Sequence, residues 1–130
     1  MPERSADWMK QAKRDLEMAQ KARETGFYEW ACFIAQQAAE KALKAVYNVK
    51  EGSAWGHSLV ELLDGLGRKV SVPGTLYRDA KQLDKHYVPT RYPDGFERGS
   101  PCEYFDDKDA DDAIGSAGRI IRFCESVLAR

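Results

Sequence analysis

Apolar side chains recur every three or four residues along most of this 130-residue chain, which is the spacing of one face of an α-helix. The pattern predicts five helices, at about residues 5–25, 27–49, 58–67, 73–89 and 106–128. No segment has the strict alternation that is typical of a half-buried strand. We therefore expect an all-α, antiparallel up-and-down bundle that forms a single domain over residues 1–130.

The second of these segments, "FYEWACFIAQQAAEKALKAVYNV", has the clearest helical pattern. Its small side chains allow neighbouring helices to approach closely, and alanine also has the highest helix propensity. We therefore place this helix at the centre of the bundle. The alanines of the stripe are Ala31, Ala35, Ala38, Ala42 and Ala45, and Phe27, Ile34, Val46 and Val49 are expected to widen the apolar face.

Polar residues mark where helices begin and end. Ser58, followed three residues later by Glu61, is typical of an N-terminal cap. The acidic run "DDKDADDA" is interpreted as charge that complements the start of the last helix, and not as a metal site. Pro89 should end the fourth helix. The irregular stretch that follows, residues 89–105, is long for a compact domain and rich in aromatic side chains, which favours an ordered functional loop.

Composition and motifs exclude several classes of function. The net charge of −1 gives no overall positive field for nucleic acid, and no apolar run is long enough to span a membrane. No secretory segment is apparent, so a cytoplasmic location is expected. Three scattered cysteines and two histidines favour neither a disulfide framework nor a metal site. Phosphate-binding glycine motifs and nucleophile motifs are also missing, so we expect no cofactor and no catalytic residues of these kinds.

A polar and aromatic group surrounds the end of the fourth predicted helix. Asp84, Tyr87, Arg91, Tyr92 and Asp94 lie close in sequence, and prolines flank Arg91 closely. In one interpretation Arg91 pairs with Asp84 or Asp94 and fastens the loop to the bundle. In the other, the stiff backbone presents Arg91 to a phosphate or a stacked base. The residues alone leave both open.

A second polar group lies on the central helix. Gln37, Lys41 and Lys44 share one face at helical spacing, and this stripe either meets solvent or lines a cleft. A lysine there could contact phosphate as a point charge. His57, just before the third helix, is expected to be a cap or loop residue.

Taken together, "AKRDLEMAQKA", "YEWACFIAQQAAEKALKAVY", "GHSLVELL" and "LDKHYVPTRYPD" resemble the prokaryotic HEPN domain over nearly the whole chain. The resemblance implies an up-and-down helical bundle, usually homodimeric. Such proteins are often encoded beside a minimal nucleotidyltransferase in toxin–antitoxin-like pairs. The family name reflects proposed nucleotide binding, and some members are metal-independent ribonucleases.

The ribonuclease branch carries an arginine and a histidine separated by four to six residues, whereas seven residues lie between Arg78 and His86 here. The resemblance therefore implies a non-catalytic domain that binds a nucleotide, RNA or a nucleotidyltransferase partner. The alternative is a degenerate ribonuclease that uses His86 with Arg78 or Arg91. The "RYPD" and "QQAAEK" elements match the family pattern. With the polar groups above, they give the candidate ligand- or partner-binding residues Gln36, Gln37, Glu40, Lys41, Lys44, His57, Asp84, Tyr87, Arg91, Tyr92 and Asp94.

Overall fold

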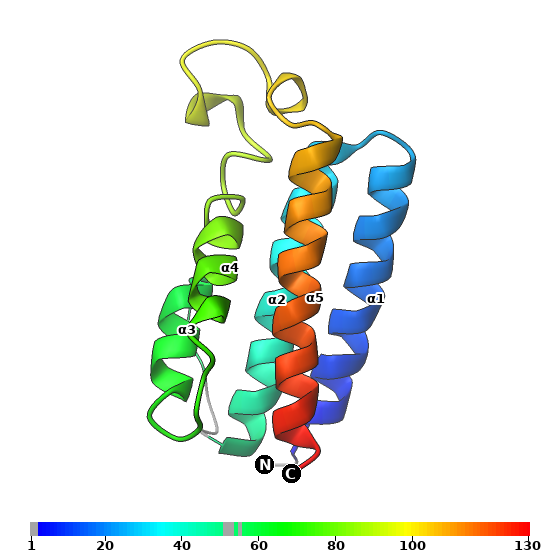
Figure 1. The fold of residues 1–130 in the computed structure, drawn as a ribbon. Helices are drawn as coiled ribbons and strands as arrows, with labels where there is room; N and C mark the ends of the chain where they lie inside the picture. Colours follow the sequence, from blue (N-terminus) through cyan, green and yellow to red (C-terminus); the bar gives the residue numbers. More distant parts are fainter. Residues whose placement is uncertain (1–2, 51–53, 55) are drawn as a thin grey trace.

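The structure, a computed structural model, describes residues 3–50, 54 and 56–130. Over these residues it contains helices and no strand, as the sequence predicts. Three long helices run side by side, and a pair of short helices covers one flank (Figure 1). The α-helices are α1 (Ser5–Glu24), α2 (Tyr28–Lys50), α3 (Leu59–Leu66), α4 (Thr75–Asp84) and α5 (Asp107–Leu128), and the short 3₁₀ turns are η1 (Pro93–Gly95) and η2 (Pro101–Glu103).

Helix α2 is the centre of the bundle and packs most extensively against α1 and α5. The five alanines of the predicted stripe are fully buried, so the stripe of small side chains is confirmed. The prediction that Phe27 and Val49 widen the apolar face is wrong. Phe27 lies in the turn before α2 and Val49 lies in its last turn, and about half of each residue is exposed.

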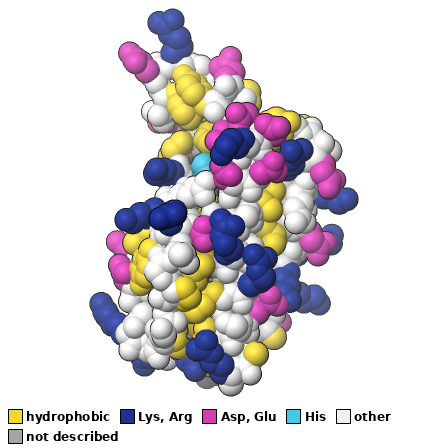
Figure 2. All heavy atoms as spheres, viewed as in Figure 1, with side chains coloured by type: hydrophobic (Ala, Val, Ile, Leu, Met, Phe, Trp, Pro, Cys, Tyr) yellow, Lys and Arg dark blue, Asp and Glu magenta, His cyan; other side chains and the backbone are white. Residues whose placement is uncertain are grey.

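The predicted helix ends are confirmed at several positions. The Ser58 hydroxyl accepts a hydrogen bond from the backbone N–H of Glu61 at 3.3 Å. At the start of α5, the Asp106 carboxylate accepts from the backbone N–H of Asp109, and the Asp109 carboxylate accepts from that of Asp106, both at 3.0 Å. The acidic run therefore caps α5, and Figure 2 shows acidic side chains gathered at this end of the bundle.

Helix α4 ends at Asp84, several residues before the expected stop at Pro89. The backbone N–H groups of His86 and Tyr87 bond to carbonyls three residues back, which tightens the chain out of α-helical geometry. The segment that follows, residues 85–106, extends beyond the end of α4 and returns to α5 (Figure 1). On this projecting segment the rings of Phe96 and Tyr104 stack with centroids 4.0 Å apart, and hydrophobic side chains are visible there in Figure 2.

The three cysteines differ in burial. Cys32 on α2 and Cys124 on α5 are buried, and burial raises the pKa of the Cys32 thiol to about 12. Cys102, in η2, is exposed.

None of the described helices is both long enough and apolar enough to cross a membrane.

Candidate functional site

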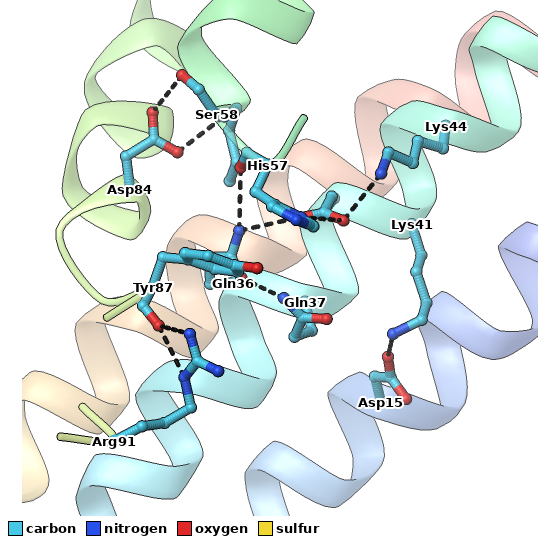
Figure 3. Close-up of polar contacts among 12 residues, drawn as sticks. Asp15, Gln36, Gln37, Lys41, Lys44, His57, Ser58, Asp84, Tyr87 and Arg91 are labelled. Atoms are coloured by element: carbon cyan, nitrogen blue, oxygen red, sulfur yellow. Dashed lines mark hydrogen bonds and ion pairs between the residues drawn. The ribbon is translucent and has the colours of Figure 1, made fainter. Parts of the chain in front are cut away.

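Tyr87 is the centre of a cluster in which the segment after α4 meets α2 (Figure 3). The imidazole of His57 stacks on the phenol ring, with centroids 4.5 Å apart and planes inclined by 20°. The guanidinium carbon of Arg91 lies 4.8 Å from the same ring centroid. Arg91 is fastened further by its Nε, which donates to the Tyr87 carbonyl at 2.9 Å, and by its Nη2, which donates to the same oxygen. The distance between the His57 ring centroid and the guanidinium carbon of Arg91 is therefore no larger than the sum of these two distances.

Arg91 is held by aromatic rings and not by a carboxylate. Its guanidinium carbon lies 4.3 Å from the ring centroid of Phe33 and 5.1 Å from that of Tyr92. Of the two interpretations, the pairing with Asp84 or Asp94 is wrong, since Arg91 forms an ion pair with no residue that the structure describes. Its Nη1 also makes no hydrogen bond within the described chain. The site thus contains a positioned cation that forms an ion pair with none of the described acids.

The backbone that carries Arg91 is a tight turn. Its N–H bonds to the Val88 carbonyl at 3.0 Å, and the buried Thr90 hydroxyl donates to the His86 carbonyl at 2.6 Å. These bonds keep the residue over the rings before any ligand arrives.

Asp84 has a structural role at the start of α3. Its carboxylate accepts from the backbone N–H groups of Leu59 at 2.7 Å and Val60 at 3.2 Å, and from the Ser58 hydroxyl at 3.1 Å. Its oxygens are therefore used to cap α3 and to join α3 to α4. Asp84 still lines, with His57, Ser58 and Tyr87, a shallow pocket of about 200 Å³.

His57 is oriented by a buried carboxylate. Its Nδ1 lies 3.0 and 3.2 Å from the two carboxylate oxygens of Glu40, whose side chain is only 7% exposed. Because an ionised carboxylate can only accept, Nδ1 carries the proton. The side chain of His57 is 52% exposed, and its Nε2 has no hydrogen-bond partner among the described residues. His57 is thus a loop residue, one of the two roles expected for it, with a fixed tautomer and an open nitrogen.

Neighbours on α2 complete the support of this carboxylate. Lys44 donates to Glu40 at 3.0 Å, and the Gln36 amide donates to Glu40 at 3.3 Å and to the His57 carbonyl at 3.2 Å. Gln37 in turn donates to the Gln36 side chain at 2.7 Å. The "QQAAEK" element therefore holds His57 in place.

The other candidates lie apart from this cluster. Lys41 is paired with Asp15 of α1 at 2.6 Å, so it joins two helices. Asp94 is exposed in η1. Sequence reasoning missed Phe33, although its position on α2, four residues before Gln37, places both side chains on neighbouring parts of one face.

The alternative pair of Arg78 and His86 is not assembled on one helix face. Arg78 is exposed on α4, whereas His86 lies beyond the end of that helix. The imidazole packs edge-on against Phe105 with centroids 5.6 Å apart, and its Nδ1 is buried without a partner in the described part of the chain. Burial lowers the pKa of His86, with a smaller contribution from Lys85, against the opposing effect of Asp109. An inward-facing, partly desolvated histidine is poorly placed to reach a substrate.

His86 makes the stability of the fold depend on pH. Because its pKa is lowered in the folded state, a proton binds more tightly to the unfolded chain. The contribution of the neutral ring is complete above the ordinary histidine pKa of 6.5, and it is lost as pH falls from that value through the lower pKa of the folded state. We expect His86→Phe to flatten the decline in unfolding free energy between neutral and mildly acidic pH, as measured by urea denaturation at several pH values. Equal slopes for His86→Phe and the wild type would contradict the assignment.

Comparison with known proteins gives consistent relatives. The family model described as "HEPN domain" matches residues 5–127. Among curated proteins, "Putative toxin MJ1304" of Methanocaldococcus jannaschii is 24% identical over 144 aligned residues, covering 93% of this chain and 86% of that protein.

Solved structures match over almost their full length. TT1696 from Thermus thermophilus superposes with a TM-score of 0.94 at 43% identity, covering 97% of this chain and 99% of that one. ST0689, described as an archaeal HEPN homologue, gives a TM-score of 0.82 at 42% identity, with coverages of 97% and 98%. A HEPN domain protein of Thermotoga maritima, tm0613, gives 0.79 at 41% identity, with coverages of 95% and 98%.

Proposed function

This chain belongs to the HEPN domain family, and we propose from that premise that it is a non-catalytic nucleotide-binding and protein-interaction domain in a toxin–antitoxin-like pair. The similarity to a protein named as a toxin supports the type of system. In this proposal residues 1–130 act as one domain and a homodimer, with a nucleotidyltransferase as the partner protein. The phosphate of the ligand binds at Arg91.

The observation that carries the proposal is the unbalanced charge of Arg91. Three rings and one carbonyl fix the guanidinium, and Nη1 has no partner among the described residues. A guanidinium suits phosphate oxygens because its N–H groups are planar and permanently charged. Since the side chain is already ordered, less conformational entropy is lost when a phosphate binds.

His57 is a second group that could contact the phosphate, because it stacks on the same Tyr87 ring as Arg91. Its Nε2 accepts a hydrogen bond in the neutral ring and donates one when the ring is protonated. Glu40 and Lys44 form an ion pair at 3.0 Å, which limits the repulsion that the buried carboxylate would exert on an anion. A phosphate near Tyr87 would thus meet Arg91 as the permanent charge and His57 as an adjustable contact.

The positions of Arg78 and His86 support the non-catalytic part of the proposal. Acid–base cleavage of RNA needs a histidine within hydrogen-bond reach of the reacting oxygen. His86 instead packs against Phe105. Arg78 lies on α4, whereas His86 lies in the turn after this helix.

Arg91→Ala tests the proposal directly. Calorimetry of the wild type with ATP, GTP and a short single-stranded RNA should detect binding to at least one of them. Losing the guanidinium should weaken that binding at least tenfold, about 1.4 kcal/mol. Arg98→Ala, which removes an exposed arginine of the same projecting segment, is the matched control and should bind as the wild type does.

Thermal denaturation of both variants separates a binding defect from loss of the fold. Absence of binding by the wild type, or unchanged affinity in Arg91→Ala, would reject the nucleotide site. Cleavage of RNA by the purified wild-type chain would reject the non-catalytic assignment, and His57→Gln and His86→Phe would then show which histidine acts.

A further inference from the structure

An apolar groove lies between the end of α1 and the start of α2. It has a volume of about 420 Å³ and is lined by Met18, Ala22, Thr25, Phe27, Trp30 and Ile34. Its largest members are substantially exposed: Met18 by 52%, Phe27 by 56% and Trp30 by 45%. Large apolar side chains gathered at one exposed place are typical of a binding surface, whereas single exposed ones are ordinary.

A row of aromatic rings connects this groove with Arg91. Trp30 lies edge-on to Phe33, with centroids 6.3 Å apart, and the guanidinium carbon of Arg91 lies 4.3 Å from the Phe33 centroid. Phe33 also contacts Tyr87, at 6.1 Å between centroids. The indole and the guanidinium are thus separated by no more than the sum of the first two distances, which is within the reach of one nucleoside triphosphate.

We infer that the groove beside Trp30 takes the base of a purine nucleotide whose phosphates bind Arg91; this inference rests on the proposed function. A nucleotide combines a flat, largely apolar ring with an anion, and the chain places an exposed indole and an unbalanced cation at matching ends of one aromatic row. Stacking of a base on an aromatic side chain contributes substantially to binding. An apolar protein segment in the groove would not account for the nearby guanidinium of Arg91. A nucleotide accounts for both the groove and the guanidinium.

The lining also predicts how selective the site is. Among the described residues that line the groove, Thr25 alone is polar, and its hydroxyl already donates to the Lys21 carbonyl at 2.9 Å. Hydrogen bonds that read the edge of a base are therefore scarce, and recognition depends on the face of the ring. ATP and GTP should bind with affinities that differ by less than about threefold, because both present a purine face.

The test compares ATP, GTP and inorganic tripolyphosphate by calorimetry with the wild type and Trp30→Ala. Tripolyphosphate has the anion but no base, so the wild type should bind ATP at least about tenfold more tightly. Trp30→Ala should reduce ATP affinity to the level of tripolyphosphate and leave tripolyphosphate affinity unchanged. Phe27→Ala, on the exposed rim of the groove, is a second variant with a smaller effect in the same direction. Tyr104→Ala, an aromatic of similar exposure on the projecting segment, is the control and should retain the preference for ATP.

The outcomes separate the two proposals. If the wild type binds neither ATP nor tripolyphosphate, the Arg91 site itself is absent. If it binds both with equal affinity, the anion site stands and the base site is rejected. If Trp30→Ala retains the preference for ATP but changes the sedimentation behaviour of the ligand-free protein, the groove is a protein interface and the inference is overturned.

Discussion

Asp84→Ala is expected to lower the free energy of unfolding by about 2–4 kcal/mol. The substitution removes the acceptor of two backbone N–H groups at the start of α3 and of the Ser58 hydroxyl. Leu59, which donates one of these bonds, is fully buried, so its N–H cannot be compensated freely by water. The loss should also loosen the contact between α3 and α4.

Urea denaturation followed by circular dichroism measures this change. Asp84→Asn keeps one carbonyl oxygen as an acceptor and should give an intermediate loss of stability. Asp94→Ala is the matched control, because this exposed aspartate has no hydrogen bond or ion pair with the residues described and should change stability by less than about 0.5 kcal/mol. Equal effects of Asp84→Ala and Asp94→Ala would show that the cap does not contribute.

Gly65→Ala is expected to destabilise the fold by about 1–3 kcal/mol, although alanine normally favours a helix over glycine by about 1 kcal/mol. A Cβ atom at this position would lie 2.2 Å from the hydroxyl oxygen of Tyr47. That hydroxyl donates to the Leu62 carbonyl at 2.6 Å, and the tyrosine is nearly buried, so it cannot move aside without losing contacts. Crowding between α2 and α3 should therefore outweigh the gain in helix propensity.

Gly74→Ala provides the comparison. A Cβ there meets nothing within 4 Å, and the residue has a right-handed backbone with φ of −58°. This variant should be neutral or slightly stabilised, since alanine restricts the unfolded chain more than glycine does. Thermal denaturation of the two variants side by side decides the point: a stabilised Gly65→Ala would mean that α2 and α3 are less closely packed at Tyr47 than the structure indicates.

The helices were predictable because their signals are local. The alanine stripe of α2, the cap at Ser58 and the acidic start of α5 depend on residues within a few turns of one another, and all appear in the structure as expected. The end of α4 was placed too late because Pro89 is a strong stop signal, whereas the earlier stop at Asp84 follows from three-residue backbone bonds that leave no mark in the apolar pattern.

The candidate site was predictable in its members but not in their contacts. The sequence left open whether Arg91 pairs with a nearby acid or faces a ligand. Its partners are a backbone carbonyl and rings that include Phe33 of α2, which only the packing of the helices brings close. Asp84 was predicted to contact a ligand. Its role as a cap for α3 was not predictable, because this contact joins parts of the chain that are distant in sequence. The approach of Glu40 to His57 likewise requires the turn before α3 to lie against α2, which spacing alone does not reveal.

The unequal burial of the three thiols gives the natural sequence a ready means of site-specific labelling. Cys102 is exposed on the projecting segment, whereas Cys32 and Cys124 are buried and desolvation raises the pKa of both, so they present almost no thiolate to a reagent. A maleimide fluorophore should therefore attach at one place without any cysteine being replaced. The dye would sit on the segment that leads from the Arg91 turn back to α5, where it could report on changes in that segment in solution.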